Sequence, residues 1–99
     1  MDVIPLGFKL GRRDWLVHSP QRLTAPGAYG RINYTLATLS VALNANGAPL
    51  TPRERGDTFW HEATHAILDD MMHPLRDNEP FVEAFSKRLS QVVHTARLP

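Results

Sequence analysis

The chain has 99 residues, of which 42% are hydrophobic, and its net charge is +1. A chain of this length forms one small domain, residues 1–99, without room for a second hydrophobic core. Because the chain contains no cysteine, disulfide frameworks and thiolate metal sites are excluded, and a metal would be held by imidazole, carboxylate or water. The small net charge also argues against a nucleic-acid surface.

No stretch of the sequence has the properties of a targeting or membrane segment. Residues 1–10 lack the basic start and the apolar run that a signal peptide carries. No stretch approaches the roughly 20 apolar residues that cross a membrane. We therefore expect a cytoplasmic protein.

The first half of the chain has the composition of short strands and loops. Two strands are predicted at residues 3–9 and 14–18, around a turn at Gly11, and the Pro- and Gly-rich residues 19–30 are predicted to form a loop. Alternating apolar residues then predict two short strands or one bent strand: Ile32, Tyr34, Leu36, Leu39, Val41 and Leu43. The segment 39–43 is either an ordinary sheet strand or an edge strand that binds an extended peptide by strand addition.

A first helix is predicted to begin at a capping box. Thr51 is the N-cap, Pro52 occupies the first helical position, and Glu54 follows the cap by three residues. The apolar side of this helix is predicted to face the core, and it consists of Trp60, Ala63, Ile67 and Met71. The helix is predicted to end at His73, because Pro74 disfavours helical dihedral angles in the residue before it.

A second helix is predicted to follow Asp77 and Asn78, either of which can cap it. Its core side is predicted to consist of Phe81, Phe85, Leu89, Val92 and Ala96, widened by Val82 and Val93. An adjacent side is polar and carries Glu79, Glu83, Ser86 and Ser90. Strands followed by two helices predict an α+β fold, in which a small antiparallel or mixed N-terminal sheet packs on two C-terminal helices.

The first predicted helix contains His61-Glu62-Ala63-Thr64-His65, an H-E-x-x-H motif. Residues four apart lie on one face of a helix, so both imidazoles can bind one metal ion. A catalytic zinc ion usually has three protein ligands and one water molecule. We therefore predict that His61 and His65 bind Zn²⁺ and that Glu62 acts as the general base.

The residues leave the third ligand open. Glu79 or Glu83 would approach the histidine pair if the second helix folds back on the first, and Glu83 would lie roughly 6 Å closer to His65 if the helices run antiparallel. His73 is a further candidate, although its position is typical of a histidine that interacts with the helix dipole. The extended motif with a third histidine ligand is excluded, because Met71 occupies the required position.

Two segments, Thr58-Phe-Trp-His-Glu-Ala-Thr-His-Ala-Ile67 and Asn78-Glu-Pro-Phe-Val-Glu-Ala-Phe-Ser-Lys-Arg-Leu89, resemble the gluzincin metallopeptidases, especially the small phage-encoded and repressor-cleaving types. In that family the ligand glutamate is followed by an acidic or amide residue, an aromatic residue or leucine, and a leucine, a spacing that Glu79, Glu83, Phe85 and Leu89 match. The resemblance implies a minimal zincin-like domain that hydrolyses peptide bonds. It also implies that His61, His65 and Glu79 hold Zn²⁺ and that Glu83 orients a ligand histidine.

Gluzincins also use a hydrogen-bond donor that stabilises the transition state, usually from beyond the glutamate helix. The candidates in this chain have no spacing argument behind them, and they are Tyr29, Tyr34, His73 and His94. A further hypothesis is that Asp14 or His18 blocks the open metal position. The competing hypothesis for function is a non-catalytic, metal-stabilised module that binds a protein partner instead of a peptide or protein substrate.

Overall fold

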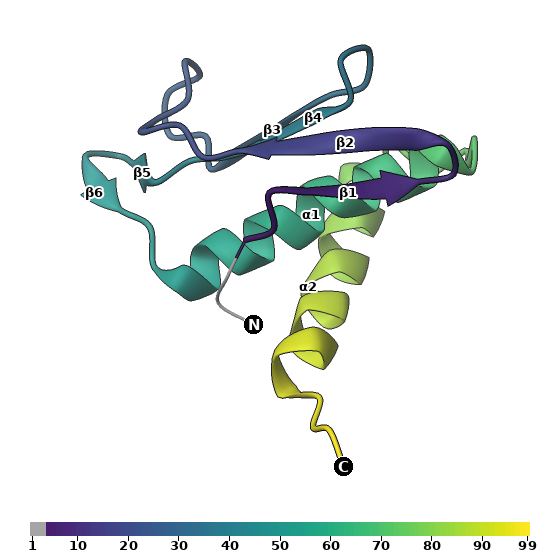
Figure 1. Ribbon diagram of the computed structural model, residues 1–99. Helices are drawn as coiled ribbons and strands as arrows, with labels where there is room; N and C mark the ends of the chain where they lie inside the picture. The colour runs from purple at the N-terminus through teal and green to yellow at the C-terminus, as the bar shows by residue number, and fades with distance from the viewer. Residues whose placement is uncertain (1–3) are drawn as a thin grey trace.

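A computed structural model describes residues 4–99. A four-stranded sheet lies over a long helix, and a second helix crosses that helix on the side away from the sheet (Figure 1). The elements in chain order are β1 (Gly7–Leu10), β2 (Arg13–His18), β3 (Gly30–Asn33), β4 (Thr38–Val41), β5 (Asn44–Ala45), β6 (Ala48–Pro49), α1 (Pro52–Asp70) and α2 (Glu79–Thr95). The α+β fold class is confirmed. In this described part, neither helix is long and apolar enough to cross a membrane.

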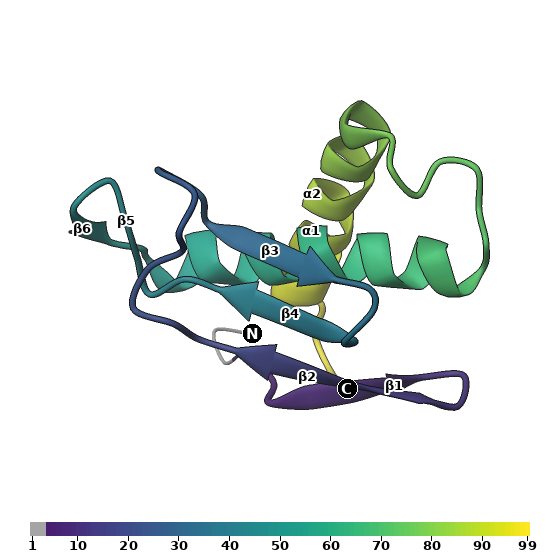
Figure 2. The ribbon, with the colours of Figure 1, turned by 90° about the horizontal axis from the view of Figure 1, so that it is seen from above.

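The sheet has the strand order β1-β2-β4-β3 (Figure 2). It is mixed, because β2 and β4 are parallel whereas β1 with β2 and β3 with β4 are antiparallel. The hypothesis that segment 39–43 is an edge strand is wrong, since β4 has neighbours on both sides. Leu39 and Val41 are fully buried in β4, which suits an interior strand. The edge strand beside α1 is β3.

The strand boundaries differ from the predictions at turns. β1 begins at Gly7, whereas Val3, at the predicted start, lies outside the described residues. Gly11 follows β1 with φ of 59°, a conformation that glycine adopts without a steric cost. The predicted strand that includes Ile32, Tyr34 and Leu36 is shorter than expected: β3 stops at Asn33, because residues 34–37 form a turn. Residues 44–49 contain the small hairpin β5–β6.

Helix α1 begins at the predicted capping box. The Thr51 hydroxyl accepts a hydrogen bond from the Glu54 backbone N–H (3.1 Å), and the Thr51 N–H donates to Oε1 of Glu54 (2.8 Å). The helix ends at Asp70, slightly before the predicted end, and Met72 has a left-handed φ of 53°. This residue turns the chain away from the helix axis before Pro74.

The hydrophobic core lies between α1 and the sheet and contains Trp15, Val17, Leu39, Val41, Phe59, Ala63 and Ala66. The predicted core side of α1 is only partly right, because Ala63 is buried but Met71 is 60% exposed. Trp60 packs against the core as predicted, and with Ile67 it lines an apolar groove of about 360 Å³ beside β1. The sheet covers the neighbouring side of the helix, where Phe59 and Ala66 lie.

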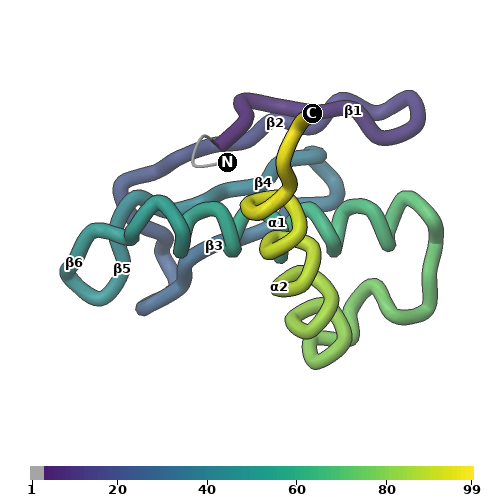
Figure 3. Tube along the Cα trace, turned by 90° about the horizontal axis from the view of Figure 1, so that it is seen from below, coloured from purple at the N-terminus to yellow at the C-terminus, as the bar shows by residue number. Residues whose placement is uncertain are grey.

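Helix α2 crosses α1 and does not run alongside it (Figure 3). Its predicted core side is only partly right, since Val82 is fully buried whereas Phe85 is 48% and Val92 62% exposed. Ser86 and Ser90, which belong to the predicted polar side, are buried beside Val82, at 2% and 0% exposed. Small side chains allow two helices to approach closely, and the Ser90 hydroxyl is satisfied because it donates to Oδ1 of Asp57 in α1 (2.5 Å). This packing turns the polar side of α2 towards α1.

Candidate metal centre and active site

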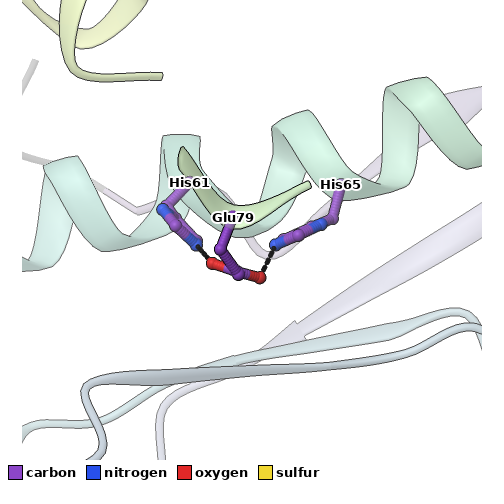
Figure 4. Close-up of side chains that lie close together, drawn as sticks. All are labelled: His61, His65 and Glu79. Carbon is purple, nitrogen blue, oxygen red and sulfur yellow. Dashed lines mark ion pairs between the residues drawn. The ribbon is translucent and has the colours of Figure 1, made fainter. Parts of the chain in front are cut away.

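The two histidines of the motif and the first residue of α2 meet at one point (Figure 4). His61 and His65 project from the same side of α1, and Glu79 lies between their imidazole rings. The His61 Nε2 atom is 3.2 Å from Oε2 of Glu79, and the His65 Nε2 atom is 2.9 Å from Oε1 of the same carboxylate. The structure therefore brings together the three residues that the resemblance implies as ligands.

These three side chains have the spacing that a small metal ion requires. Each offers one ligand atom, and these atoms lie within 4.8 Å of one another. Tetrahedral ligands at 2.0–2.2 Å from zinc are about 3.4 Å apart, which is close to the observed nitrogen–oxygen separations. Two imidazole nitrogens and one carboxylate oxygen also match the donors that zinc accepts. His61, His65 and Glu79 can therefore hold a metal ion with little rearrangement.

Both imidazoles are oriented through their second ring nitrogen. The His65 Nδ1 atom is 2.6 Å from the backbone carbonyl oxygen of Arg76, and the His61 Nδ1 atom is 3.0 Å from Oε2 of Glu83. An Nδ1–H that donates to these acceptors leaves the Nε2 lone pair free for a metal. Both Nε2 atoms face Glu79, so the hydrogen bonds prepare the pair for binding.

The crossing of the helices explains why Glu79 and Glu83 occupy different positions. The expectation that Glu83 lies closer to His65 assumed antiparallel helices, which the structure does not have (Figure 3). Glu79 contacts both imidazoles, whereas Glu83 contacts His61 on the side away from Glu79. Glu83 also pairs with Lys87 at 3.3 Å. Of the two glutamates, only Glu79 has its carboxylate between the histidines.

The loop between the helices supplies a contact that the sequence did not indicate. Arg76 takes part through its backbone carbonyl, and no side-chain pattern marks such a residue in advance. His73 stabilises this loop, because its Nδ1 atom accepts a hydrogen bond from the Leu75 N–H (3.0 Å). In residues 4–99 the metal-binding group does not include His73, so the structure does not support it as the third ligand.

Glu62 is buried next to the histidines. Glu62 is only 8% exposed, and it lines a cavity of about 380 Å³ together with Gly30, His61 and Glu83. Burial raises the pKa of the Glu62 carboxyl above its usual value; His61 and His65 act in the opposite direction, and Glu79 adds to the increase. A raised pKa suits a carboxylate that must accept and then release a proton.

The edge strand β3 touches Glu62 at a glycine. A β-carbon on Gly30 would lie 2.5 Å from Cγ2 of Thr58 and 2.9 Å from Oε2 of Glu62. The absence of a side chain therefore lets the strand approach the motif helix. The sequence prediction assigned Gly30 to a loop and missed this role. The only feature of the sequence that could have indicated this close approach is the position of Gly30, just before the alternating apolar residues that begin at Ile32.

The remaining sequence candidates lie in different surroundings. Tyr29 lines the cavity beside Glu62, and Tyr34 packs against the hydrophobic core. His94 is near the end of α2, where its Nδ1 atom lies 2.7 Å from the Ser90 carbonyl oxygen. Asp14 and His18 are exposed on β2 and do not belong to the metal-binding group of the described residues. The hypothesis that they block the metal position has no support in this arrangement.

Comparison with known protein families, with curated proteins and with solved structures finds no match.

Proposed function

We propose that this protein is a zinc metallopeptidase. The observation that carries the proposal is the placement of both Nε2 atoms around the Glu79 carboxylate, with the buried Glu62 beside them in a cavity. This combination provides three metal ligands and a separate carboxylate that is not needed as a ligand. A purely structural metal site would use a closed set of four ligands and would have no need for such a base.

The chemistry follows from these positions. A bound Zn²⁺ would polarise the scissile carbonyl and lower the pKa of a water molecule to about 7. Glu62 takes a proton from the attacking water as the new carbon–oxygen bond forms, and it passes this proton to the leaving amine nitrogen as the carbon–nitrogen bond breaks. Glu83 and the Arg76 carbonyl keep the two imidazoles in the orientation that ligation requires.

An extended peptide has a suitable partner in β3. Within residues 4–99 this strand pairs with β4 on one side only, and its first residue, Gly30, touches Glu62. A peptide that adds to the free edge by backbone hydrogen bonds would run past the general base. We therefore propose a peptide or unfolded protein segment as the substrate class.

The test compares wild type with Glu62→Gln, both loaded with Zn²⁺ after treatment with a chelator. The probe is a randomised library of fluorogenic peptides, with zinc content measured by elemental analysis. We expect both proteins to carry one zinc ion, and the variant to lose about 10²–10⁴-fold in activity, because it lacks the general base. Equal cleavage by the two proteins, or a wild type that carries no more zinc than His61→Ala, would contradict the proposal.

A second candidate function is a metal-stabilised module that binds a protein without cleaving it. The exposed apolar side of α2 favours it, since Phe85 and Val92 are 48% and 62% exposed. Such a module would keep its zinc and its biological effect in the Glu62→Gln variant. Loss of the effect together with loss of cleavage would leave only the peptidase.

A further inference from the structure

We propose that the cavity beside Glu62 binds a lysine or arginine side chain of the substrate, next to the bond that is cleaved. This inference rests on the proposed peptidase function and adds a substrate class to it. The cavity has a volume of about 380 Å³, at the lower end of the range of about 300–1,000 Å³ that ligand sites have. It therefore suits one long side chain better than a larger ligand.

The cavity begins at the proposed catalytic residues and extends to one side of them. His61 and Glu62 line it, whereas the other two proposed metal ligands, His65 and Glu79, do not. The remaining lining residues of α1 precede His61 by about one or two helical turns. A side chain in the cavity would thus belong to a residue on one side of the cleaved bond only.

A peptide paired with the edge strand β3 would direct side chains into this cavity. Gly30, the first residue of β3, lines the cavity and touches Glu62. The side chains of an extended peptide alternate between the two sides of a sheet, so every second one faces α1. The strand has no side chain of its own at Gly30 that would stand in the way. A substrate side chain close to the general base can therefore enter the cavity.

The charges that line the cavity are predominantly negative. Four acidic residues contribute to the lining, and they are Glu54, Asp57, Glu62 and Glu83. Lys87 is the one basic residue that lines it. A cavity with such an excess of carboxylates attracts cations and repels anions. The charges thus favour a basic substrate side chain over an acidic one.

Several oxygens of these carboxylates are available to a ligand. Oε1 of Glu54 accepts from the cap of α1, and Oδ1 of Asp57 accepts from Arg53 and Ser90. Within residues 4–99 the second oxygen of each has no hydrogen-bond partner. Glu62 is more than nine-tenths buried, and its carboxylate forms no hydrogen bond or ion pair with residues 4–99.

A buried acceptor without a donor is costly, and charged donors make the strongest hydrogen bonds to carboxylates. Lysine and arginine side chains carry donors only. Because Glu62 stands at the catalytic end of the cavity, the aliphatic part of the substrate side chain would pass it. The cationic end would then reach Glu54 and Asp57. Glu62 remains available for the proton of the attacking water.

The resident Lys87 does not satisfy this demand. Its Nζ atom pairs with Oε1 of Glu83 at 3.3 Å, and its side chain is 69% exposed. An exposed pair of this kind within one helix is weak. Lys87 therefore leaves Glu54 and Asp57 to a ligand, and its charge opposes the binding of a second cation.

The experiment measures kcat/KM of the zinc-loaded protein for matched fluorogenic peptides. Once the randomised library has identified a cleaved bond, lysine, arginine, norleucine and glutamate are placed in turn at each of the two positions that flank it. Norleucine has an unbranched chain without a charge. We expect lysine or arginine to exceed norleucine by about 10–100-fold, as hydrogen bonds between charged groups allow, and at one position only. Glutamate there should be cleaved more slowly than norleucine.

Variants identify the carboxylates that are responsible. Glu54→Gln and Asp57→Asn remove a negative charge but keep the oxygen that accepts the structural hydrogen bonds. Each should lower the ratio of kcat/KM for lysine to that for norleucine by about 2–5-fold, because both groups are partly exposed, and the double variant should lower it further. Lys87→Gln should raise the ratio. Asp14→Asn is the matched control, since Asp14 lies outside the cavity on β2, and it should keep the wild-type ratio.

The outcomes separate this proposal from the peptidase proposal. Cleavage by wild type without a preference for basic side chains, or with an equal preference at both positions, overturns only the role of the cavity. An unchanged ratio in a double variant that carries full zinc also overturns it, because the cation would then bind elsewhere. The comparison of substrates uses wild type alone, so it decides even if a variant fails to fold. A zinc-loaded wild type that cleaves no peptide overturns both proposals.

Discussion

Zinc should stabilise this protein against heat, by an amount that depends on Glu79 more than on Glu83. The three ligand atoms are already within 4.8 Å of one another, so binding requires little rearrangement. The metal must replace the contacts between the histidines and Glu79. Glu79 is 65% exposed, and exposed ion pairs contribute only about 0–1 kcal/mol. Nearly all of the binding free energy therefore appears as added stability.

The magnitude follows from mass action. At a free zinc concentration 100 times the dissociation constant, the free energy of unfolding rises by about 2.7 kcal/mol. For a domain of 60–100 residues each kcal/mol raises Tm by about 4–8 °C, which predicts an increase of about 11–22 °C. Mutation of a residue that only orients a ligand typically lowers metal affinity by about 10–100-fold. At the same zinc concentration, Glu83→Ala should then retain about 0.4–1.4 kcal/mol.

The assay is thermal unfolding followed by circular dichroism, with and without zinc, after the wild-type dissociation constant has been determined by competition with a zinc indicator. Glu79→Ala removes a ligand and should retain less of the increase in Tm than Glu83→Ala. Asp14→Ala is the matched control, because this exposed carboxylate pairs with Lys9 at 3.6 Å, away from the site. It should keep the full wild-type increase.

Two results would refute this reasoning. An increase in Tm that is the same for wild type and Glu79→Ala would mean that the carboxylate is not a ligand. A smaller increase for Glu83→Ala than for Glu79→Ala would exchange the roles of the two glutamates. The ordering of the variants is thus more informative than the size of the wild-type effect.

Three further predictions concern positions around the site. Gly30→Ala places a β-carbon 2.5 Å from a side-chain carbon of α1. Overpacking of this kind should lower the free energy of unfolding, measured by urea titration, by about 1–3 kcal/mol. Unchanged stability would mean that β3 can move away from α1 freely. Ser90→Ala removes the buried hydrogen bond to Asp57, so we expect the free energy of unfolding to fall by about 1–3 kcal/mol while zinc affinity stays unchanged. Unchanged stability would mean that the helix crossing depends on the small size of the side chain and not on its hydrogen bond. In Tyr29→Phe, absorbance at 295 nm should follow Tyr34 with a pKa of about 12, above the ordinary value of 10.0. Because the fold favours the neutral phenol, its contribution to stability is complete below pH 10 and is lost as the pH rises to 12, and a midpoint at 10 would contradict the described surroundings.

Local signals in the sequence led to correct predictions where a few neighbouring residues control the structure. The capping box of Thr51 and Glu54 marked the start of α1, because both hydrogen bonds of the box form within four residues. The α+β order of strands and helices also followed from periodicity. Prediction was only partly right for the side of α2 that packs on α1: Val82 is buried as expected, but hydrophobicity also favoured Phe85 and Val92 over Ser86 and Ser90. A close helix crossing rewards small side chains, and composition alone does not reveal such a crossing.

The sequence by itself determined that two imidazoles and a carboxylate share one stretch of helix, since the spacing of His61, Glu62 and His65 requires only helical geometry. The tertiary structure decided what surrounds them. The crossing of α2 over α1 brings Glu79 between the imidazoles and leaves Glu83 at the outer nitrogen of His61. The approach of β3 at Gly30 encloses Glu62. These contacts join residues far apart in the chain, and their distances depend on how closely whole elements can pack.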